Sequence, residues 1–352
     1  MSTDKPLRLG AAYHGNRMPR HARQDLLDMA VHGMDLVVHM FSHTDWERYK
    51  MAMKDIVAMS EDAGLEVWVD NWGLGGPPGD KSHFLAYFPD SHMYLSNGDM
   101  DPVRACLNSP DFRRFTREWI DAVYFLGART VFWDEPQIPH KEVDGKRYYG
   151  CTCKRCRKLF EERYGYPMPV EATPEAEAFC ANSIVDYFRE MTEYAASKGM
   201  KNALCVMLGS FGMNTEVIHQ LCNLPYVDNI GSDPYWLYRR PQEPDLNVYD
   251  YTYRGTLENL RIANQACKDH NVWLQTHMNP RGLEEEIIQA AEGIYDAGGR
   301  TILAWGYYGS ESNNYAAKNA PVTWAKTCEA MQRLRNFERD RILTENRRLF
   351  KK

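Results

Sequence analysis

The chain has 352 residues, of which 44% are hydrophobic, so it is long enough to bury one large core. Its 42 Lys and Arg against 48 Asp and Glu give a net charge of −6, with both signs mixed along the chain. This balance argues against a nucleic-acid partner, which usually requires a basic patch. Residues 1–6 have no apolar run behind them. We therefore expect no signal peptide, no transmembrane segment and a cytoplasmic location.

Eight short apolar or β-branched segments recur along the chain, each bounded by Gly, Pro, Asn or Asp. Several are almost entirely apolar, which is typical of parallel strands that are buried on both faces. We predict strands at residues 7–15, 35–41, 66–72, 130–135, 201–208, 227–233, 272–277 and 301–306.

Helical patterns lie between these segments. Residues 46–63 have apolar positions at helical spacing and end before Gly64, whereas Ser109 and Pro110 offer an N-cap and a first helical residue. Similar signals predict helices from Thr173 to about residue 199 and over residues 284–297. The alternation predicts the α/β class, a parallel sheet and right-handed crossovers, which eight units close into a (β/α)₈ TIM barrel.

One domain over residues 1–352 is the simplest organisation, because the chain has no low-complexity linker or break in composition. The competing fold, a doubly wound open sheet, usually carries a Gly-rich phosphate loop after its first strand, and residues 10–15 do not form one.

Two connections are too long to be simple loops: residues 73–108 after predicted strand three and residues 140–169 after strand four. We expect both to wall a pocket at the C-terminal ends of the strands, and their exposed surface is compatible with a homo-oligomer.

Four cysteines in these two loops have the spacing of a metal site. Cys151, Cys153 and Cys156 form a C-x-C-x₂-C motif, and Cys106 lies in the other long loop. Three thiols this close cannot all pair as disulfides, but with Cys106 they can surround one tetrahedral Zn²⁺. Such a site would be structural, because four thiolates leave no open position for water. The alternative is that they are reduced surface cysteines. The remaining cysteines are expected to be small core residues: Cys180, Cys205, Cys222, Cys267 and Cys328.

The segment from Cys106 through a helix, a strand ending in Glu135, and the cysteine motif up to Gly165 resembles the catalytic barrel of glycoside hydrolase family 42 β-galactosidases. The resemblance implies that the four cysteines bind zinc and that Glu135 is the general acid/base. Two positions depart from the family pattern. The family has Asn where this chain has Asp134, and its nucleophilic Glu ends strand seven, where this chain has no carboxylate. The resemblance therefore implies neither a nucleophile nor specificity for galactose.

Cleavage of a glycosidic bond needs one carboxylic acid to protonate the leaving oxygen and a second group to attack, or to activate water. We predict Glu135 as the acid, because its neighbours Trp133 and Pro136 are apolar and would partly desolvate it. Asp233 ends predicted strand six and is the leading second carboxylate. It would act as the nucleophile of a retaining enzyme or as the base of an inverting one. Alternatively, it binds a sugar hydroxyl.

The adjacent Asp134 and Glu135 support an alternative mechanism. The pair is similar to that of substrate-assisted β-N-acetylhexosaminidases, in which the Asp orients the substrate's 2-acetamido group and that group attacks the anomeric carbon. This mechanism would explain why strand seven lacks a nucleophile. Asp134 could instead lie in a buried polar network behind Glu135.

Polar and aromatic residues near the predicted strand ends suit a carbohydrate, because a sugar ring has an apolar C–H face and polar hydroxyls. The predicted substrate-binding residues are His14, His39, Asp70, Trp72, Tyr235, Trp236, His277 and Trp305. We expect no organic cofactor.

Two further functions stay open. His14, His39, His43 and His277 could hold a divalent metal together with the carboxylates, as in metal-dependent sugar isomerases and epimerases. No tight ligand motif joins them in one segment, which argues against this class. A non-catalytic carbohydrate-binding barrel is the third candidate, because strand seven lacks a carboxylate.

Overall fold

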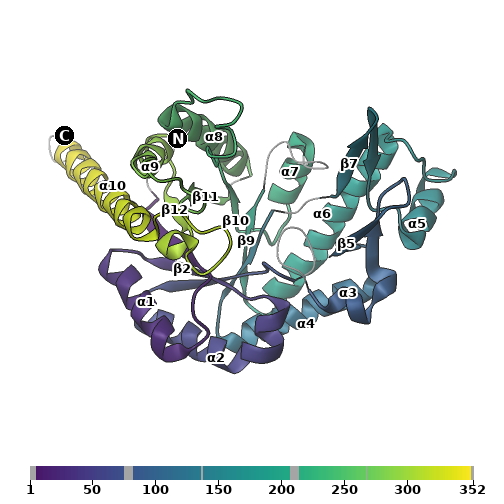
Figure 1. Ribbon diagram of the computed structural model, residues 1–352, viewed down its shortest axis with the longest axis horizontal. Coiled ribbons are helices and arrows are strands. Elements are labelled where there is room, and N and C mark those ends of the chain that lie inside the picture. The colour runs from purple at the N-terminus through teal and green to yellow at the C-terminus, as the bar shows by residue number, and fades with distance from the viewer. Residues whose placement is uncertain (1–4, 75–81, 136–137, 207–213, 267, 350–352) are drawn as a thin grey trace. The chain divides into compact units, whose positions relative to one another are not determined.

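Eight parallel strands form a closed barrel in the order β1-β12-β11-β10-β9-β6-β3-β2 (Figure 1). The computed structural model describes residues 5–74, 82–135, 138–206, 214–266 and 268–349. The predicted (β/α)₈ barrel is therefore confirmed. The barrel strands are β1 (Arg8–Tyr13), β2 (Leu36–Met40), β3 (Glu66–Asp70), β6 (Thr130–Trp133), β9 (Lys201–Cys205), β10 (Asn229–Ser232), β11 (Asp269–Gln275) and β12 (Thr301–Trp305).

All eight predicted strands occur, and most of their ends differ by one or two residues from the prediction. The largest shift is at β11, which begins at Asp269 rather than at residue 272. Residues 207 and 208 of the fifth predicted strand lie outside the described residues.

Gly10 shows why one position in β1 must be small. It pairs with Leu36 of β2, and a Cβ there would lie 2.3 Å from the Leu36 carbonyl oxygen.

The helix caps follow the sequence signals. Ser109 accepts a hydrogen bond from the Phe112 N–H at the start of α4, and the helix ends at Gly127, whose φ of 100° is left-handed. Thr173 caps α6 in the same way through the Ala176 N–H. The helices are α1 (Pro19–Val31), α2 (His43–Asp62), α3 (Phe84–Tyr87), α4 (Pro110–Leu126), α5 (Lys154–Tyr164), α6 (Pro174–Ser197), α7 (Thr215–Cys222), α8 (Val248–Gln265), α9 (Glu286–Asp296) and α10 (Ala320–Leu349).

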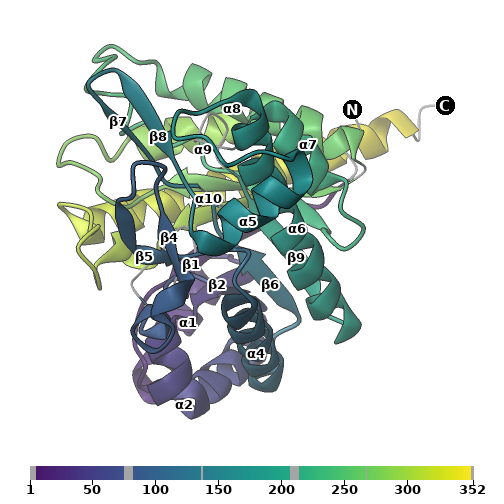
Figure 2. The same ribbon diagram turned by 90° about the vertical axis from the view of Figure 1, so that its right-hand side faces the viewer.

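Each long connection contains an antiparallel hairpin that the sequence analysis did not predict. The first hairpin joins β4 (His92–Tyr94) to β5 (Met100–Ala105), and the second joins β7 (His140–Val143) to β8 (Lys146–Tyr149). Backbone hydrogen bonds link the two connections, from the Thr152 N–H to the Tyr94 carbonyl and from the Ser96 N–H to the Tyr149 carbonyl, both 2.8 Å. Both hairpins lie near α5 in Figure 2.

The chain divides into two compact units. The first contains residues 1–39, 55–68 and 231–352, and the second contains residues 40–54 and 69–230. In the first unit, α8, α9 and α10 pack beside one another, and Trp273 contacts Trp305 edge to face at 4.9 Å. In the second unit, Trp119 packs on Trp133 at 5.9 Å within the core. The single domain over residues 1–352 stays a prediction.

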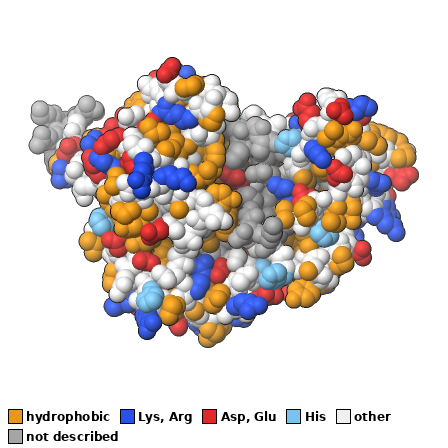
Figure 3. Space-filling view, in the orientation of Figure 1, with side chains coloured by type: hydrophobic (Ala, Val, Ile, Leu, Met, Phe, Trp, Pro, Cys, Tyr) orange, Lys and Arg blue, Asp and Glu red, His pale blue; other side chains and the backbone are white. Residues whose placement is uncertain are grey.

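Charged side chains of both signs are interspersed with apolar ones on the face shown in Figure 3, in line with the mixed charges of the sequence. Among the described residues, no helix combines the length and the apolar character needed to cross a bilayer.

Candidate functional site

Three carboxyl groups of the second unit gather at the ends of β3 and β6, which are neighbours in the barrel. Asp70 is the last residue of β3, and Asp134 and Glu135 directly follow β6. Asn71 joins the two strand ends. Its N–H donates to the Phe132 carbonyl at 3.3 Å, and its Oδ1 accepts a hydrogen bond from the Asp134 N–H at 3.1 Å. These bonds hold the carboxyl groups at one point of the barrel edge.

The backbone turns sharply at Glu135, whose φ of 26° is left-handed. The strand has already ended at Trp133, so the alternation of side chains along a strand no longer applies here. Asp134 is buried, whereas Glu135 is half-buried. The more accessible of the two carboxyl groups is therefore the one that the sequence analysis predicted to be the general acid.

Asp70 and Asp134 are acids in surroundings that disfavour their charged forms. Burial raises the pKa of Asp70 well above its usual value, and the charge of Glu135 raises it further, whereas a 2.8 Å hydrogen bond from the Trp72 N–H to Oδ1 lowers it. Burial also raises the pKa of Asp134, with added contributions from Asp70 and Glu135. The site therefore favours retention of protons on these two buried groups.

Neutral histidines and aromatic rings form a second group of predicted residues, in the first unit. His14 contacts Trp305 edge to face at 5.1 Å. His277 lies 3.1 Å from the Trp305 carbonyl through Nδ1 and 3.0 Å from the Tyr238 hydroxyl through Nε2, and its ring packs against Tyr235. Burial lowers the pKa of His14 to about 3 and that of His277 to about 4, so both rings are neutral at pH 7.

A cavity of about 480 Å³ opens beside His14 in the first unit. Asp25 of α1 forms part of its wall and accepts a 2.6 Å hydrogen bond from Tyr13, the last residue of β1. Other lining residues are Asn16, Tyr307, Tyr308 and Glu311. Sequence reasoning missed Asp25, because a lone Asp within a helix carries no signal of a site. The lining therefore includes carboxylates, hydroxyls and tyrosine rings.

Two other predicted binding residues lie in packed surroundings. His39 is fully buried, and its Nε2 lies 2.9 Å from the Ser60 hydroxyl of α2, so the ring contacts the helix that covers its strand. Trp236 is also fully buried and donates a 2.7 Å hydrogen bond to Glu286 of α9. This geometry favours packing roles for both residues. Trp72, Tyr235 and Trp305 are half-buried, and their sugar-binding roles stay predictions.

Asp233 follows β10 and is half-buried in the first unit. Its charge contributes to the raised pKa of Tyr251, in which burial is the larger cause. The pairing of Asp233 with Glu135 stays a prediction. Strand seven of the barrel, β11, ends in the amide Gln275, whose Oε1 accepts a 3.0 Å hydrogen bond from the Leu237 N–H.

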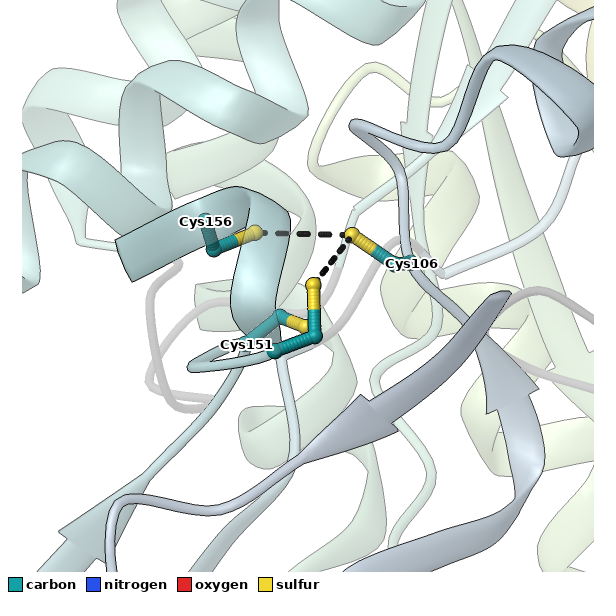
Figure 4. Close-up of side chains that lie close together, drawn as sticks. Cys106, Cys151 and Cys156 are labelled. Carbon is teal, nitrogen blue, oxygen red and sulfur yellow. Dashed lines mark hydrogen bonds between the residues drawn. The ribbon is translucent and has the colours of Figure 1, made fainter. Parts of the chain in front are cut away.

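The four predicted zinc ligands come together in the second unit (Figure 4). Cys106 follows β5, Cys151 and Cys153 lie between β8 and α5, and Cys156 lies in the first turn of α5. All four are buried, and their sulfurs lie within 4.8 Å of one another. The Cys106 Sγ is 3.4 Å from that of Cys156 and 3.6 Å from that of Cys153, too far for disulfides.

This donor set fits a tetrahedral metal ion such as Zn²⁺. Zn–S bonds of about 2.3 Å place neighbouring sulfurs roughly 3.8 Å apart, close to the observed separations. Hydrogen bonding, above all to Cys106, lowers the pKa of Cys153, whereas hydrogen bonding to Cys151 raises that of Cys106. These hydrogen bonds favour the thiolate form of Cys153 and the protonated form of Cys106, and a bound dication would favour ionisation of its thiol ligands. Asn108 donates to the Cys156 sulfur at 3.4 Å from outside the cluster.

The other cysteines within the described residues are not among the four clustered ligands. Cys180, Cys205 and Cys222 are buried as predicted, Cys328 is half-buried, and Cys267 lies outside the described residues. The described residues contain two groups with ligand atoms close enough for a metal ion: the four cysteines, and a cluster of His43, Glu47 and His83. His14, His39 and His277 belong to neither group.

No family model matches the chain, and no curated protein matches it. Solved structures do. A β-galactosidase from the psychrophilic Marinomonas ef1 aligns with a TM-score of 0.69 at 12% identity, over 97% of this chain and 60% of that one. The catalytic domain of a β-amylase from Paenibacillus polymyxa aligns with a TM-score of 0.64 at 8% identity, over 92% of this chain and 98% of that one. A GH5_18 structure from Streptomyces cattleya in complex with GlcNAc aligns with a TM-score of 0.59 at 14% identity, over 94% of this chain and 81% of that one. At these identities the likeness shows the shared barrel fold, which hosts many reactions.

Proposed function

We propose that the chain is a glycoside hydrolase in which Glu135 is the general acid/base. The observation that carries this proposal is the arrangement at the ends of β3 and β6, where a half-buried Glu135 stands beside two buried carboxyl groups. Catalytic groups of barrel enzymes lie at this end of the strands. The named glycosidases among the similar structures agree with this function at the level of the fold.

In the proposed reaction, Glu135 gives its proton to the glycosidic oxygen as the bond to the anomeric carbon breaks. Asp233 is the proposed second carboxylate. It either attacks the anomeric carbon, after which water transfers a proton to Glu135 and releases the sugar, or it takes a proton from the water that attacks directly. The first route retains the anomeric configuration and the second inverts it.

Asp70 and Asp134 take supporting roles in this proposal. A buried carboxyl group that keeps its proton can donate a hydrogen bond, which an ionised one cannot. The burial of Asp134 and its backbone hydrogen bond to Asn71 support a role behind Glu135. They favour that role over direct contact with a substrate acetamido group.

The proposed substrate is a small oligosaccharide or glycoside. The cavity beside His14 supports this class, because its tyrosine rings can stack on sugar C–H faces while its carboxylates and the neutral His14 imidazole bind hydroxyls. We further propose that the cysteine cluster holds structural Zn²⁺. The ion would tie the two hairpin-containing connections together, because its ligands come from both.

The test compares Glu135→Gln with the wild type on a panel of glycosides with good and poor leaving groups. We expect the variant to lose about 10²–10⁴-fold in kcat/KM, which reports the bond-breaking step, on poor leaving groups that need protonation. The loss of kcat/KM should be much smaller on dinitrophenyl glycosides, which do not need it. Glu142→Gln, at an exposed position of β7, is the matched control.

Equal losses of kcat/KM on both kinds of leaving group would contradict the assignment of Glu135 as the acid. A wild type that binds sugars but cleaves none of the panel would instead support a non-catalytic carbohydrate-binding barrel. Circular dichroism and thermal unfolding would show whether the variant keeps the fold.

A further inference from the structure

Two histidines and a glutamate converge on one point of the second unit, away from the cysteines. His43 and Glu47 lie one turn apart at the start of α2, and His83 directly precedes α3. One carboxylate oxygen of Glu47 is 3.2 Å from His43 Nε2, and the other is 3.4 Å from His83 Nδ1. All three ligand atoms lie within 4.8 Å of one another.

We infer that His43, Glu47 and His83 form a second metal site, for an exchangeable divalent transition-metal ion such as Zn²⁺, Cu²⁺ or Ni²⁺. Imidazole nitrogens and a carboxylate are ligands that these ions accept together. Bonds of about 2.0–2.2 Å around a tetrahedral ion place neighbouring ligand atoms roughly 3.4 Å apart. Each histidine nitrogen lies at about that distance from one of the two Glu47 oxygens, so the carboxylate is already beside both rings.

The surroundings hold His43 in place before any ion binds. Its ring packs edge to face on Phe115 at 4.7 Å and close to Trp46. Its Nδ1 lies 2.9 Å from the Ser82 hydroxyl, which leaves Nε2 on the side of Glu47. A partner on the second ring nitrogen is the usual companion of a metal-binding histidine, because it fixes the orientation of the ring.

The backbone that carries the ligands is also fixed. Ser42 and Asp45 cap α2 reciprocally, since the Asp45 N–H donates to the Ser42 hydroxyl at 3.2 Å and the Ser42 N–H donates to the Asp45 carboxylate at 3.0 Å. Next to His83, Phe84 is buried, and its N–H donates to Ser82 at 3.1 Å. The two segments that the ion would join are therefore held in place without the ion.

Charge and exposure also favour a cation. In the part of the chain that the structure describes, no Lys or Arg pairs with Glu47, whose only ion-pair partners are the two histidines. The side chains of Glu47 and His83 are 36% and 53% exposed, so water can complete the coordination shell and the ion can exchange. This openness distinguishes the site from the buried cysteine cluster.

The experiment counts bound zinc after dialysis against micromolar Zn²⁺, by elemental analysis of the wild type, Glu47→Gln and His83→Ala. His21→Ala, at an exposed histidine of α1, is the matched control. We expect the wild type and the control to hold one ion per chain more than the two site variants. This difference of one ion does not depend on occupancy of the cysteines, and Cys153→Ser should retain it. Equal counts in the wild type and both site variants would overturn the inference, and the three residues would then form only a hydrogen-bonded network.

A second measurement uses stability in place of stoichiometry. Because a ligand that binds only the folded state stabilises it, added Zn²⁺ should raise the Tm of the wild type and of Cys153→Ser. It should not raise the Tm of Cys153→Ser combined with His83→Ala. An equal rise in the combined variant would contradict the site. Neither measurement uses catalytic activity, so the outcome is independent of the proposed hydrolase function.

Discussion

The cysteine cluster and the carboxylate cluster of the second unit face the same electrostatic problem and differ in their geometry. Each gathers buried acids that cannot all ionise side by side. The four sulfurs converge within 4.8 Å, so one cation can neutralise all of them. Asp70, Asp134 and Glu135 do not form such a group, and the shifted pKa values indicate that the buried members keep protons instead. Convergence of the donor atoms, rather than the number of acids, therefore distinguishes a metal site from an acid/base site.

The largest effect is expected at the cysteines. Cys153→Ser removes one of the four proposed ligands, so the protein should lose its zinc and about 3–5 kcal/mol of stability. Zinc content and thermal unfolding would measure both, and a chelator should reproduce the loss in the wild type. Cys328→Ser, at a half-buried cysteine outside the cluster, is the control. Unchanged zinc and an unchanged Tm would remove the distinction between the two clusters.

Asp70→Asn should act in the opposite direction, by stabilising the protein at alkaline pH. A raised pKa in the folded state means that the folded protein binds more protons than the unfolded chain, so the wild type loses stability as pH rises above about 4. The amide carries no such cost and keeps an oxygen for the Trp72 N–H. We expect a gain at pH 8 that shrinks as the pH falls and vanishes below pH 4, measured by urea unfolding across pH. A gain that is equal at all pH values would show that retained protons are not its cause.

A smaller and pH-independent effect is expected at Asn71. Asn71→Ala leaves the buried Asp134 N–H without its acceptor, which should cost about 1–2 kcal/mol. The same change should lower kcat on poor leaving groups more than it raises KM, because the backbone that carries Glu135 is no longer held. Denaturant unfolding and steady-state kinetics test the two parts. An effect on stability alone would limit Asn71 to a structural role.

The smallest effect is expected at the edge of the cysteine cluster. Asn108→Ala removes the hydrogen bond to the Cys156 sulfur, so zinc affinity should fall by about tenfold with little change in the fold. Competition with a chromogenic chelator measures this. If the zinc affinity stays the same, the four sulfurs alone determine it. Hydrogen bonds from neighbouring residues would then matter less for the cysteine cluster than for the carboxylate cluster.

The buried histidines of the first unit are expected to make the folded protein less stable at acidic pH. Because burial lowers the pKa of His14 and of His277, the unfolded chain binds protons that the folded protein does not, and stability should fall as pH drops below about 6.5. This trend is opposite in sign to that of Asp70, so the unfolding profile can separate the two groups.

Local patterns were sufficient for the elements and their order. Eight apolar runs, the Ser109 and Thr173 caps and the glycines after helices determined the barrel, because burial on both faces and capping act over a few residues. The cysteine spacing likewise predicted a cluster, since three of its members lie within six residues. The hairpins within the long loops were missed, because their strands are short and largely polar.

Only the tertiary structure decided which of these side chains are buried and which residues they contact. The sequence treated Trp72 and Trp236 alike, yet the first is half-buried and the second is packed against Glu286. It placed Asp134 beside Glu135, but the left-handed turn at Glu135 and the bond to Asn71 determine that one carboxyl group is buried and the other accessible. The convergence of His43 and Glu47 with His83, some forty residues away, likewise comes from the fold, which brings the start of α2 beside the segment before α3. Short-range preferences encode strands and caps, whereas contacts between distant segments are chosen by packing the whole chain.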